Sequence, residues 1–155
     1  SIGFRELNLE YLTSMVAEEG LVSGLLEGDI NFYPDSAAST FTSDISVKDF
    51  QIRDVPWGNL ALKVDQASAN RFDVDFGLTG QVNDLRIDGY YQGGESPAMN
   101  LTAVISEFGL PSLQPLLADQ LRDLTGTLTG RLRVKGTPEN PDIDGNLLFS
   151  NAEFL

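Results

Sequence analysis

The sequence predicts a mainly β protein with one large antiparallel-type sheet and one or two short helices. Apolar and polar residues alternate through most of the chain, and this is the side-chain period of a strand. Only two short segments have helical spacing, so there are too few helices to cover the apolar faces of the strands. A sheet curved around an inner channel satisfies this pattern, and so does an ordinary sandwich with a filled interior.

The composition excludes several classes of function. The 155 residues include 10 Lys and Arg against 23 Asp and Glu, and the formal net charge of -13 disfavours binding to nucleic acids and anionic membrane surfaces. The chain has no cysteine and no histidine, which excludes disulfides, zinc sites with those ligands, thiol catalysis and Ser-His triads. We predict no enzyme activity, no metal site, no cofactor and no nucleic-acid partner.

The N-terminal segment predicts a helix over residues 4–19, because its apolar side chains have roughly helical spacing and Gly20 follows as a stop. The apolar positions of this helix are Phe4, Leu12, Met15 and Val16. From Leu21 onward the period changes to two, and residues 24–33 predict the first strand.

Residues 39–53 predict the next strand, in which the apolar phase shifts by one residue near Lys48 and Asp49. A β-bulge produces such a shift. Pro56 is expected to separate this strand from the following one, whose inward residues are Leu60, Leu62 and Val64.

The middle of the chain continues the alternation. Residues 70–79 are its clearest example, residues 80–91 predict one or two strands, and a further strand runs through Met99 and Ile105. Residues 111–123 then predict a helix. Its apolar stripe consists of Leu113, Leu116, Leu117, Leu121 and Leu124.

Two strands complete the prediction, one over residues 124–136 and one carrying Ile143 to Phe149, joined by a turn over residues 137–141. A second shift of phase falls before Phe154. Glycines share the apolar face of both strands, where they allow close approach of backbones and sharp bending.

The chain contains an internal repeat. Gly24 and Gly28 match Gly126 and Gly130 at a constant offset of 102 residues, and a predicted helix precedes each copy. We interpret residues 1–155 as one segment of a larger repetitive β protein, with units at 4–103 and 106–155. The second unit is truncated after two strands, and both ends are expected to have been cut from a longer chain.

Two acidic motifs are interpreted as ordinary surface. Asp73 and Asp75 share the polar face of a strand, and no other catalytic residue accompanies them. The segment PDIDGN, residues 141–146, lacks the third ligand position and the closing Glu of a calcium loop, so we interpret it as a turn. The basic row Arg131, Arg133 and Lys135 is likewise interpreted as a solvated face, although it could meet a lipid phosphate or an acidic strand.

The motif that follows the second predicted helix is the most informative part of the chain. It has the form L-x-G-x-L-x-G-x-L-x-V-x-G-T, a turn with Pro, and x-I-x-G-x-L-x-F. This segment resembles the translocation-and-assembly-module B (TamB) family of AsmA-like proteins, and the earlier copy at Gly24 to Ile52 matches more loosely. The residues that carry the resemblance are Gly126, Leu128, Gly130, Leu132, Val134, Gly136, Thr137, Pro141, Ile143, Gly145, Leu147 and Phe149.

The resemblance implies a long rolled sheet, open along one side, with an apolar concave face. It implies a periplasmic location, in a parent protein anchored in the inner membrane of a diderm bacterium. It further implies that phospholipid acyl chains are carried toward the outer membrane, and that the full-length protein works beside an Omp85-type barrel partner. Exposed edge strands also favour a dimer of the isolated chain.

We therefore expect a lipid-conducting segment with an apolar groove. The alternatives are a scaffold that assembles outer-membrane β-barrels by β-augmentation, and a closed adhesin- or carbohydrate-binding β domain. The predicted groove lining consists of Leu26, Ile30, Phe32, Ile45, Val47, Leu60, Leu62, Val64, Phe72, Val74, Phe76, Leu78, Leu101, Leu128, Leu132, Val134, Leu147 and Phe149.

Overall fold

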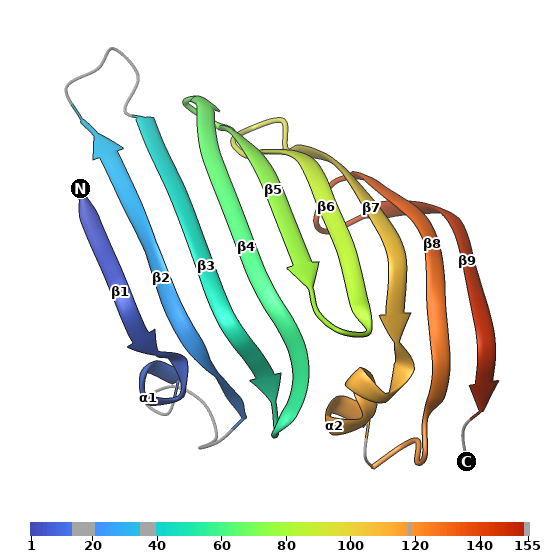
Figure 1. Cartoon of the computed structure of the whole chain (residues 1–155). Coiled ribbons are helices and arrows are strands. Elements are labelled where there is room, and N and C mark those ends of the chain that lie inside the picture. Colours follow the sequence, from blue (N-terminus) through green and yellow to red (C-terminus); the bar gives the residue numbers. More distant parts are fainter. Residues whose placement is uncertain (14–20, 35–39, 118, 154–155) are drawn as a thin grey trace.

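The computed structural model describes residues 1–13, 21–34, 40–117 and 119–153 as nine strands and three short helical segments (Figure 1). The strands are β1 (Ile2–Asn8), β2 (Val22–Tyr33), β3 (Thr40–Ile52), β4 (Val55–Ser68), β5 (Arg71–Thr79), β6 (Asn83–Gln92), β7 (Ala98–Gly109), β8 (Thr125–Gly136) and β9 (Pro141–Glu153). The helical segments are α1 (Leu9–Thr13), the 3-10 helix η1 (Leu110–Leu113) and α2 (Gln114–Leu117).

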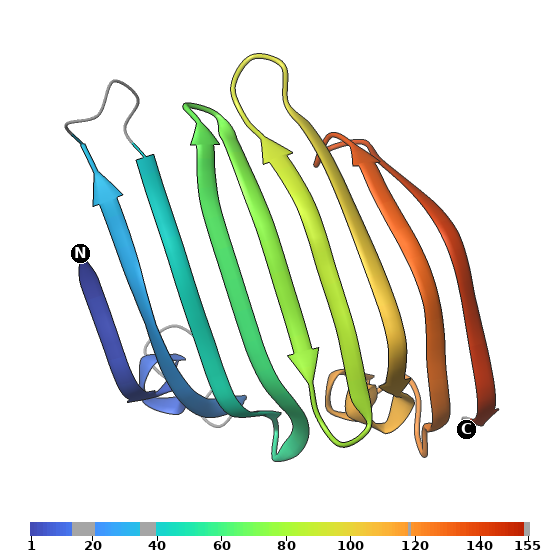
Figure 2. The same ribbon diagram turned by 45° about the horizontal axis from the view of Figure 1, so that its top comes forward.

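All nine strands form one open sheet, in which spatial order equals sequence order from β1 to β9 and every pairing is antiparallel. Figure 2 shows the strands side by side as one layer, with α1 and α2 at the same end of the sheet. The prediction of a mainly β protein with a large antiparallel sheet is confirmed. Within the described residues no second sheet packs on the first, so the sandwich alternative is wrong.

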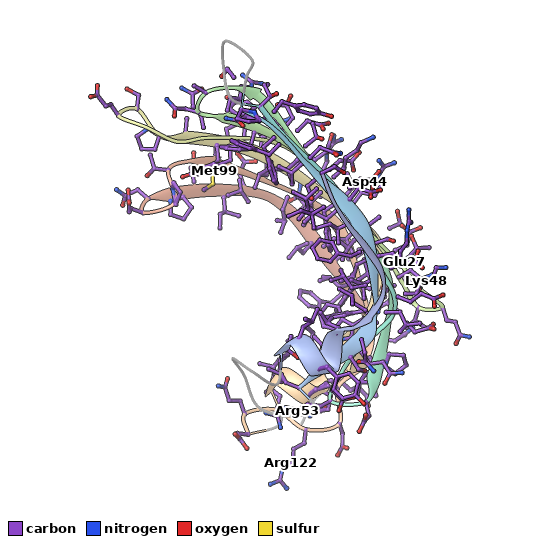
Figure 3. All side chains as sticks on the ribbon, turned by 90° about the vertical axis from the view of Figure 1, so that its left-hand side faces the viewer. Glu27, Asp44, Lys48, Arg53, Met99 and Arg122 are labelled. Atoms are coloured by element: carbon purple, nitrogen blue, oxygen red, sulfur yellow. The ribbon has the colours of Figure 1, made fainter. Side chains whose placement is uncertain are left out.

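The sheet is strongly curved along its strands. Viewed from the β1 side, the strands bend into a C whose inner side carries mostly hydrocarbon side chains, while Glu27, Asp44 and Lys48 project from the outer side (Figure 3). The helix α1 lies on the inner side near one end of the C. We call the inner side the concave face and the outer side the convex face.

β-Bulges interrupt the strand pairing at the predicted places. The register between β3 and β4 shifts between Val47 and Phe50, and Asp49 has a φ of 54°, which confirms the predicted bulge near Lys48 and Asp49. A matching shift lies in β9, where Asn151 has a φ of 53°. Phe154, which follows it, lies outside the described residues.

The prediction that Pro56 separates two strands is wrong. The turn between β3 and β4 lies at Arg53 and Asp54, whose φ values of 48° and 67° are typical of a two-residue type I′ hairpin. Pro56 is the second residue of β4, a position near the start of a strand where a missing N–H is tolerated.

The helix predicted over residues 4–19 is wrong in its first part. Residues 2–8 form β1, and Phe4 pairs with Gly28 on the edge of β2. Pairing with an open sheet edge outweighs local spacing here, because it satisfies backbone groups that would otherwise have no partner. The helix begins only after Asn8, whose side chain accepts a hydrogen bond from the Glu10 amide at 3.0 Å. Met15 and Val16 lie outside the described residues.

The helix predicted over residues 111–123 is shorter than expected. It consists of η1 and α2 and ends at Leu117. The Gln114 side chain donates to the Leu121 carbonyl at 2.7 Å and accepts from the Leu124 amide at 3.0 Å. These bonds hold the following segment in a loop. The leucines of the predicted apolar stripe therefore do not share one face of a helix. Leu116 is exposed, whereas Leu124 is buried.

The pairing of β8 with β9 reproduces that of β2 with β3 at an offset of 102 residues. Leu26 faces Val47 as Leu128 faces Phe149, and the bulge between Ser23 and Leu25 recurs between Thr125 and Thr127. The backbone thus has the periodicity that the glycines have in the sequence. The division into units at 4–103 and 106–155 stays a prediction.

Two equivalent glycines show how the sheet accommodates its curvature. Gly28 and Gly130 have φ values of 153° and 152°, and a Cβ atom at either position would overlap a backbone carbonyl of the next strand, that of Asp44 or Asn146. L-residues rarely adopt such φ values, so glycine is needed for the conformation as well as for the space. Gly77, in contrast, has open space where a Cβ atom would lie, with no neighbouring atom within 4 Å.

We expect Gly130→Ala to lower the free energy of unfolding by about 1–3 kcal/mol, because it introduces both backbone strain and a backbone clash. The matched control Gly77→Ala should change it by less than about 1 kcal/mol. Chemical denaturation followed by the fluorescence of Trp57 measures both variants. Equal stability of the two variants would contradict this account of the glycines.

Candidate functional site

The concave face carries apolar residues in continuous rows that cross the strands. Residues directly opposite each other in antiparallel pairs point to the same side of a sheet, so the register defines these rows. The central row consists of Ile45, Leu62, Phe76, Ile87, Ala103 and Leu132. It runs without a polar residue from β3 to β8.

Rows on either side of the central row extend the apolar surface. One consists of Ile30, Ser43, Val64, Val74, Gly89, Leu101, Val134 and Ile143, and the other of Leu26, Val47, Leu60, Leu78, Leu85, Ile105, Gly130 and Leu147. The only hydroxyl in these rows, on Ser43, is buried at 6% exposure. The surface is therefore apolar over eight strands.

The predicted lining residues all belong to this face, although their burial differs. Most are half-buried, whereas Val47 and Leu78 are 7% and 1% exposed and contribute to packing more than to an open surface. Phe32, Leu147 and Phe149 lie at the margins of the face and are exposed. Contact of these residues with acyl chains stays a prediction.

Several residues of the face are absent from the predicted lining. They include Phe4, Leu85, Ile87, Ala103 and Ile105, which pair within the rows. The other four residues, from Leu85 to Ile105, could have been predicted from the sequence, because they continue its two-residue alternation. Phe4 was not detectable, because its segment has helical spacing and only tertiary pairing makes it a strand.

Little of the concave face is covered. Among the described hydrophobic residues, the buried ones are Val47, Ile52, Leu78, Phe108, Leu110 and Leu124. The chain exposes 10010 Å², whereas a compact protein of its 16.9 kDa mass would expose about 7,700 Å². An extended single layer with an uncovered apolar side explains the excess.

One end of the concave face is closed by a packed cluster around Trp57. Its ring meets Phe50 and Phe108 in edge-to-face contacts, with centroids 6.2 and 5.3 Å away. The Trp57 indole N–H donates to the Ser112 carbonyl at 3.0 Å. This hydrogen bond joins η1 to β4. The helical segment therefore lies across the end of the sheet.

Asn83 connects the elements of this closed end. Its amide Nδ2 donates to the Trp57 carbonyl and to the Ser112 hydroxyl, both at 3.0 Å, and its Oδ1 accepts from the Gly109 amide at 2.8 Å. Asn83 and Ser112 are 1% and 3% exposed. A buried amide with its donors and acceptor satisfied fixes one arrangement of its neighbours. No pattern in the sequence distinguished Asn83 from the exposed asparagines.

The convex face is polar and mostly acidic. The register aligns Asp29, Asp44, Lys63, Asp75 and Asp88 across five strands. Ion pairs on this face are exposed and long, such as Arg86 to Asp75 at 3.4 Å, and pairs of this kind contribute little to stability. The two faces of the sheet thus differ sharply in polarity.

The acidic residues of the remaining sequence motifs lie on this polar side. Asp73 and Asp75 are exposed and lie near Arg71 and Arg86 respectively, as expected of surface residues. The PDIDGN segment belongs to β9 and not to a turn, because Pro141 to Asn146 pair in register with β8. In the part of the chain that the structure describes, no group of three or more acidic residues is placed to hold a metal ion.

Comparison with known proteins identifies no relative. No family model matches the chain, and neither a curated protein nor a solved structure is significantly similar to it. Among the described residues, no helix has the length and apolar character needed to cross a membrane.

We expect Asn83→Ala to lower the free energy of unfolding by about 2–4 kcal/mol, because it leaves the Gly109 amide and the Trp57 carbonyl without their buried partner. Asn146→Ala, on the exposed side of β9, should change it by less than about 0.5 kcal/mol. Urea denaturation of both variants measures the difference. A neutral Asn83→Ala would show that the closed end does not depend on this network.

Proposed function

We propose that the chain is a structural lipid-conducting segment of a bacterial envelope protein, in which the apolar concave face shields phospholipid acyl chains between the inner and outer membranes. The observation that carries this proposal is the row Ile45, Leu62, Phe76, Ile87, Ala103 and Leu132, half-buried and apolar across six strands. Exposed apolar surface of such extent is uncommon in soluble proteins and usually marks a binding site.

The dimensions of the face suit a lipid tail. Neighbouring strands lie about 4.8 Å apart, so the nine strands span roughly 38 Å along the rows. One leaflet contributes about 15 Å of hydrocarbon to a bilayer. An acyl chain lying along a row therefore contacts several strands, and more than one chain can be accommodated end to end.

The chemistry of the concave face favours movement of an acyl chain along the rows over tight binding at one position. Each methylene removed from water contributes about 0.8 kcal/mol, and this attraction has no directional requirement. Because the side chains of successive strands in a row are similarly apolar, a tail can exchange one set of contacts for the next at similar free energy. The packed cluster of Trp57 and η1 closes one end of the concave face, and none of its residues belongs to the central row.

The cellular setting of the proposal comes from the resemblance of residues 124–154 to the TamB family. The resemblance implies a periplasmic location, in a parent protein anchored in the inner membrane and acting beside an Omp85-type barrel partner. The curved sheet with an apolar concave face agrees with the architecture that the resemblance implies. The closed carbohydrate-binding alternative requires a filled interior, which the described residues do not have.

The expected result of Leu62→Arg is a loss of lipid from the purified chain. The guanidinium would project into the central row, and loss of contact with about two methylenes lowers affinity roughly tenfold. Organic extraction followed by mass spectrometry measures lipid per mole of protein for the wild-type chain and the variant.

The matched control is Ala61→Arg, because Ala61 is the next residue of β4 and points to the convex face. This variant adds the same charge to the same strand and should retain its lipid. Equal lipid content in both variants, or no lipid in the wild-type chain, would contradict the proposal.

A further inference from the structure

β8 carries a row of basic side chains along its convex face. Arg131, Arg133 and Lys135 occupy alternate positions of this strand, so their side chains lie on one side of the sheet. They are three of the 10 Lys and Arg residues in a chain with a formal net charge of -13. Their concentration on a single strand contrasts with the mostly acidic character of the convex face. We call these three residues the basic row.

The side chains of the basic row make no ion pair and no hydrogen bond with other described residues. The register sets Arg131 opposite Asn146 and Arg133 opposite Asp144. Both arginines are exposed, so their N–H groups can reach a ligand. A guanidinium group binds a carboxylate through two parallel hydrogen bonds, which a Lys ammonium group cannot do. The basic row is therefore suited to carboxylate recognition.

The fold does not require the basic row. β2 pairs with β3 as β8 pairs with β9, at the same offset of 102 residues. The residues of β2 that are equivalent to the basic row are Asp29, Asn31 and Tyr33. One backbone arrangement thus accommodates acidic, neutral or basic side chains at these positions. Exposed charge that the fold does not require is available for recognition of a partner of opposite charge.

A shallow hollow and two exposed aliphatic residues adjoin the basic row. The hollow has a volume of about 320 Å³ and is lined by Arg131, Arg133, Asp144, Gly145 and Asn146. Val104 of β7 faces Arg131, and Leu148 of β9 faces Thr129. These two aliphatic side chains are 39% and 64% exposed. A free anion would use only the charges, whereas a polypeptide side chain contacts aliphatic groups as well.

The spacing of the basic row fits an extended peptide. Residues two positions apart in a strand are separated by about 6.8 Å, so the three cations span roughly 14 Å. A single phosphate or carboxylate group is too small to meet all three cations. An extended polypeptide with acidic residues at alternate positions repeats at the same distance as the basic row. Each of its carboxylates can therefore meet one cation.

The surroundings of the basic row disfavour a flat anionic membrane surface. Asp142 and Asp144 lie opposite Lys135 and Arg133, and Asp88 lies two strands away on the other side. A membrane would meet these carboxylates together with the basic row, whereas a peptide along β8 meets mainly the cations. Charges further away than about 8 Å are largely screened at physiological salt. The other acidic residues of the chain therefore oppose a bound peptide only weakly.

We propose that the basic row and the hollow beside it bind an extended acidic segment of a second polypeptide. The segment lies along the convex face of β8 and carries Glu at alternate positions, whose carboxylates pair with the basic row. The methylene groups of these Glu side chains contact Val104 and Leu148. The site lies on the opposite side of the sheet from the central row, and it does not depend on lipid binding.

Two labelled peptides of equal length test the site. Glu alternates with Thr in the first peptide, and Gln alternates with Thr in the control peptide. Fluorescence anisotropy measures the Kd of each peptide for the whole chain at about 0.15 M salt, where the Debye length is about 8 Å. We expect the Glu peptide to bind at least about fivefold more tightly than the Gln peptide, because it forms up to three exposed ion pairs.

Two double variants of the chain locate the binding. In Arg131→Gln/Arg133→Gln the preference for the Glu peptide should fall below about twofold, because only one cation of the basic row is left. The matched control Lys48→Gln/Lys63→Gln removes the same number of charges from exposed positions of β3 and β4 and should retain the full preference. Circular dichroism checks that both variants retain the sheet.

Equal binding of the two peptides by the wild-type chain would overturn the proposal. So would a preference for the Glu peptide that persists in Arg131→Gln/Arg133→Gln or that disappears in Lys48→Gln/Lys63→Gln. Vesicles of anionic phospholipid provide a separate probe in a sedimentation assay. Binding of the vesicles but not of the Glu peptide, lost in the arginine variant, would assign the basic row to lipid phosphates and would equally overturn the proposal.

Discussion

The structure depends on the backbone pairing of nine strands in one layer. In a two-layer protein the apolar side of a sheet is buried by packing against another element. Here the described residues provide only α1, η1 and α2, which lie at one end. Apolar side chains along each row pack on their neighbours within the sheet, and the ladder of antiparallel hydrogen bonds keeps them in place.

Curvature follows from this constraint. Bending the strands into a C turns the apolar side inward and the charged side toward solvent (Figure 3). The bend requires local backbone conformations that few residues adopt, which accounts for glycine at Gly28 and Gly130 and for the bulges at Asp49 and Asn151. The glycines weaken the strands as isolated segments, but they permit the curved sheet that the rest of the chain requires.

Much of this fold could be predicted from the sequence. Alternation identified the strands, and the shift of phase identified the bulge at Asp49, because one extra residue moves every following side chain to the other face. The N-terminal strand could not be predicted, since Phe4 and its neighbours have helical spacing and become a strand only through pairing with β2.

The site was predictable in part for the same reason. The apolar face follows from period-two spacing, whereas its extent depends on register, which sets Ile45, Leu62 and Phe76 in one row. The Asn83 network could not be anticipated, because it joins residues that are far apart in the chain and have no spacing in common. Long-range hydrogen bonds of this kind leave no periodic signal.

We propose that the concave face contacts lipid and that the convex face does not. Photo-crosslinking inside bacterial cells tests it most directly, with a photoreactive amino acid placed at Leu132 in one variant and at its neighbour Arg131 in the other. Mass spectrometry of the captured material is expected to show phospholipid adducts at Leu132 and none at Arg131. Equal capture of phospholipid at both positions, or capture only of protein at Leu132, would contradict the account.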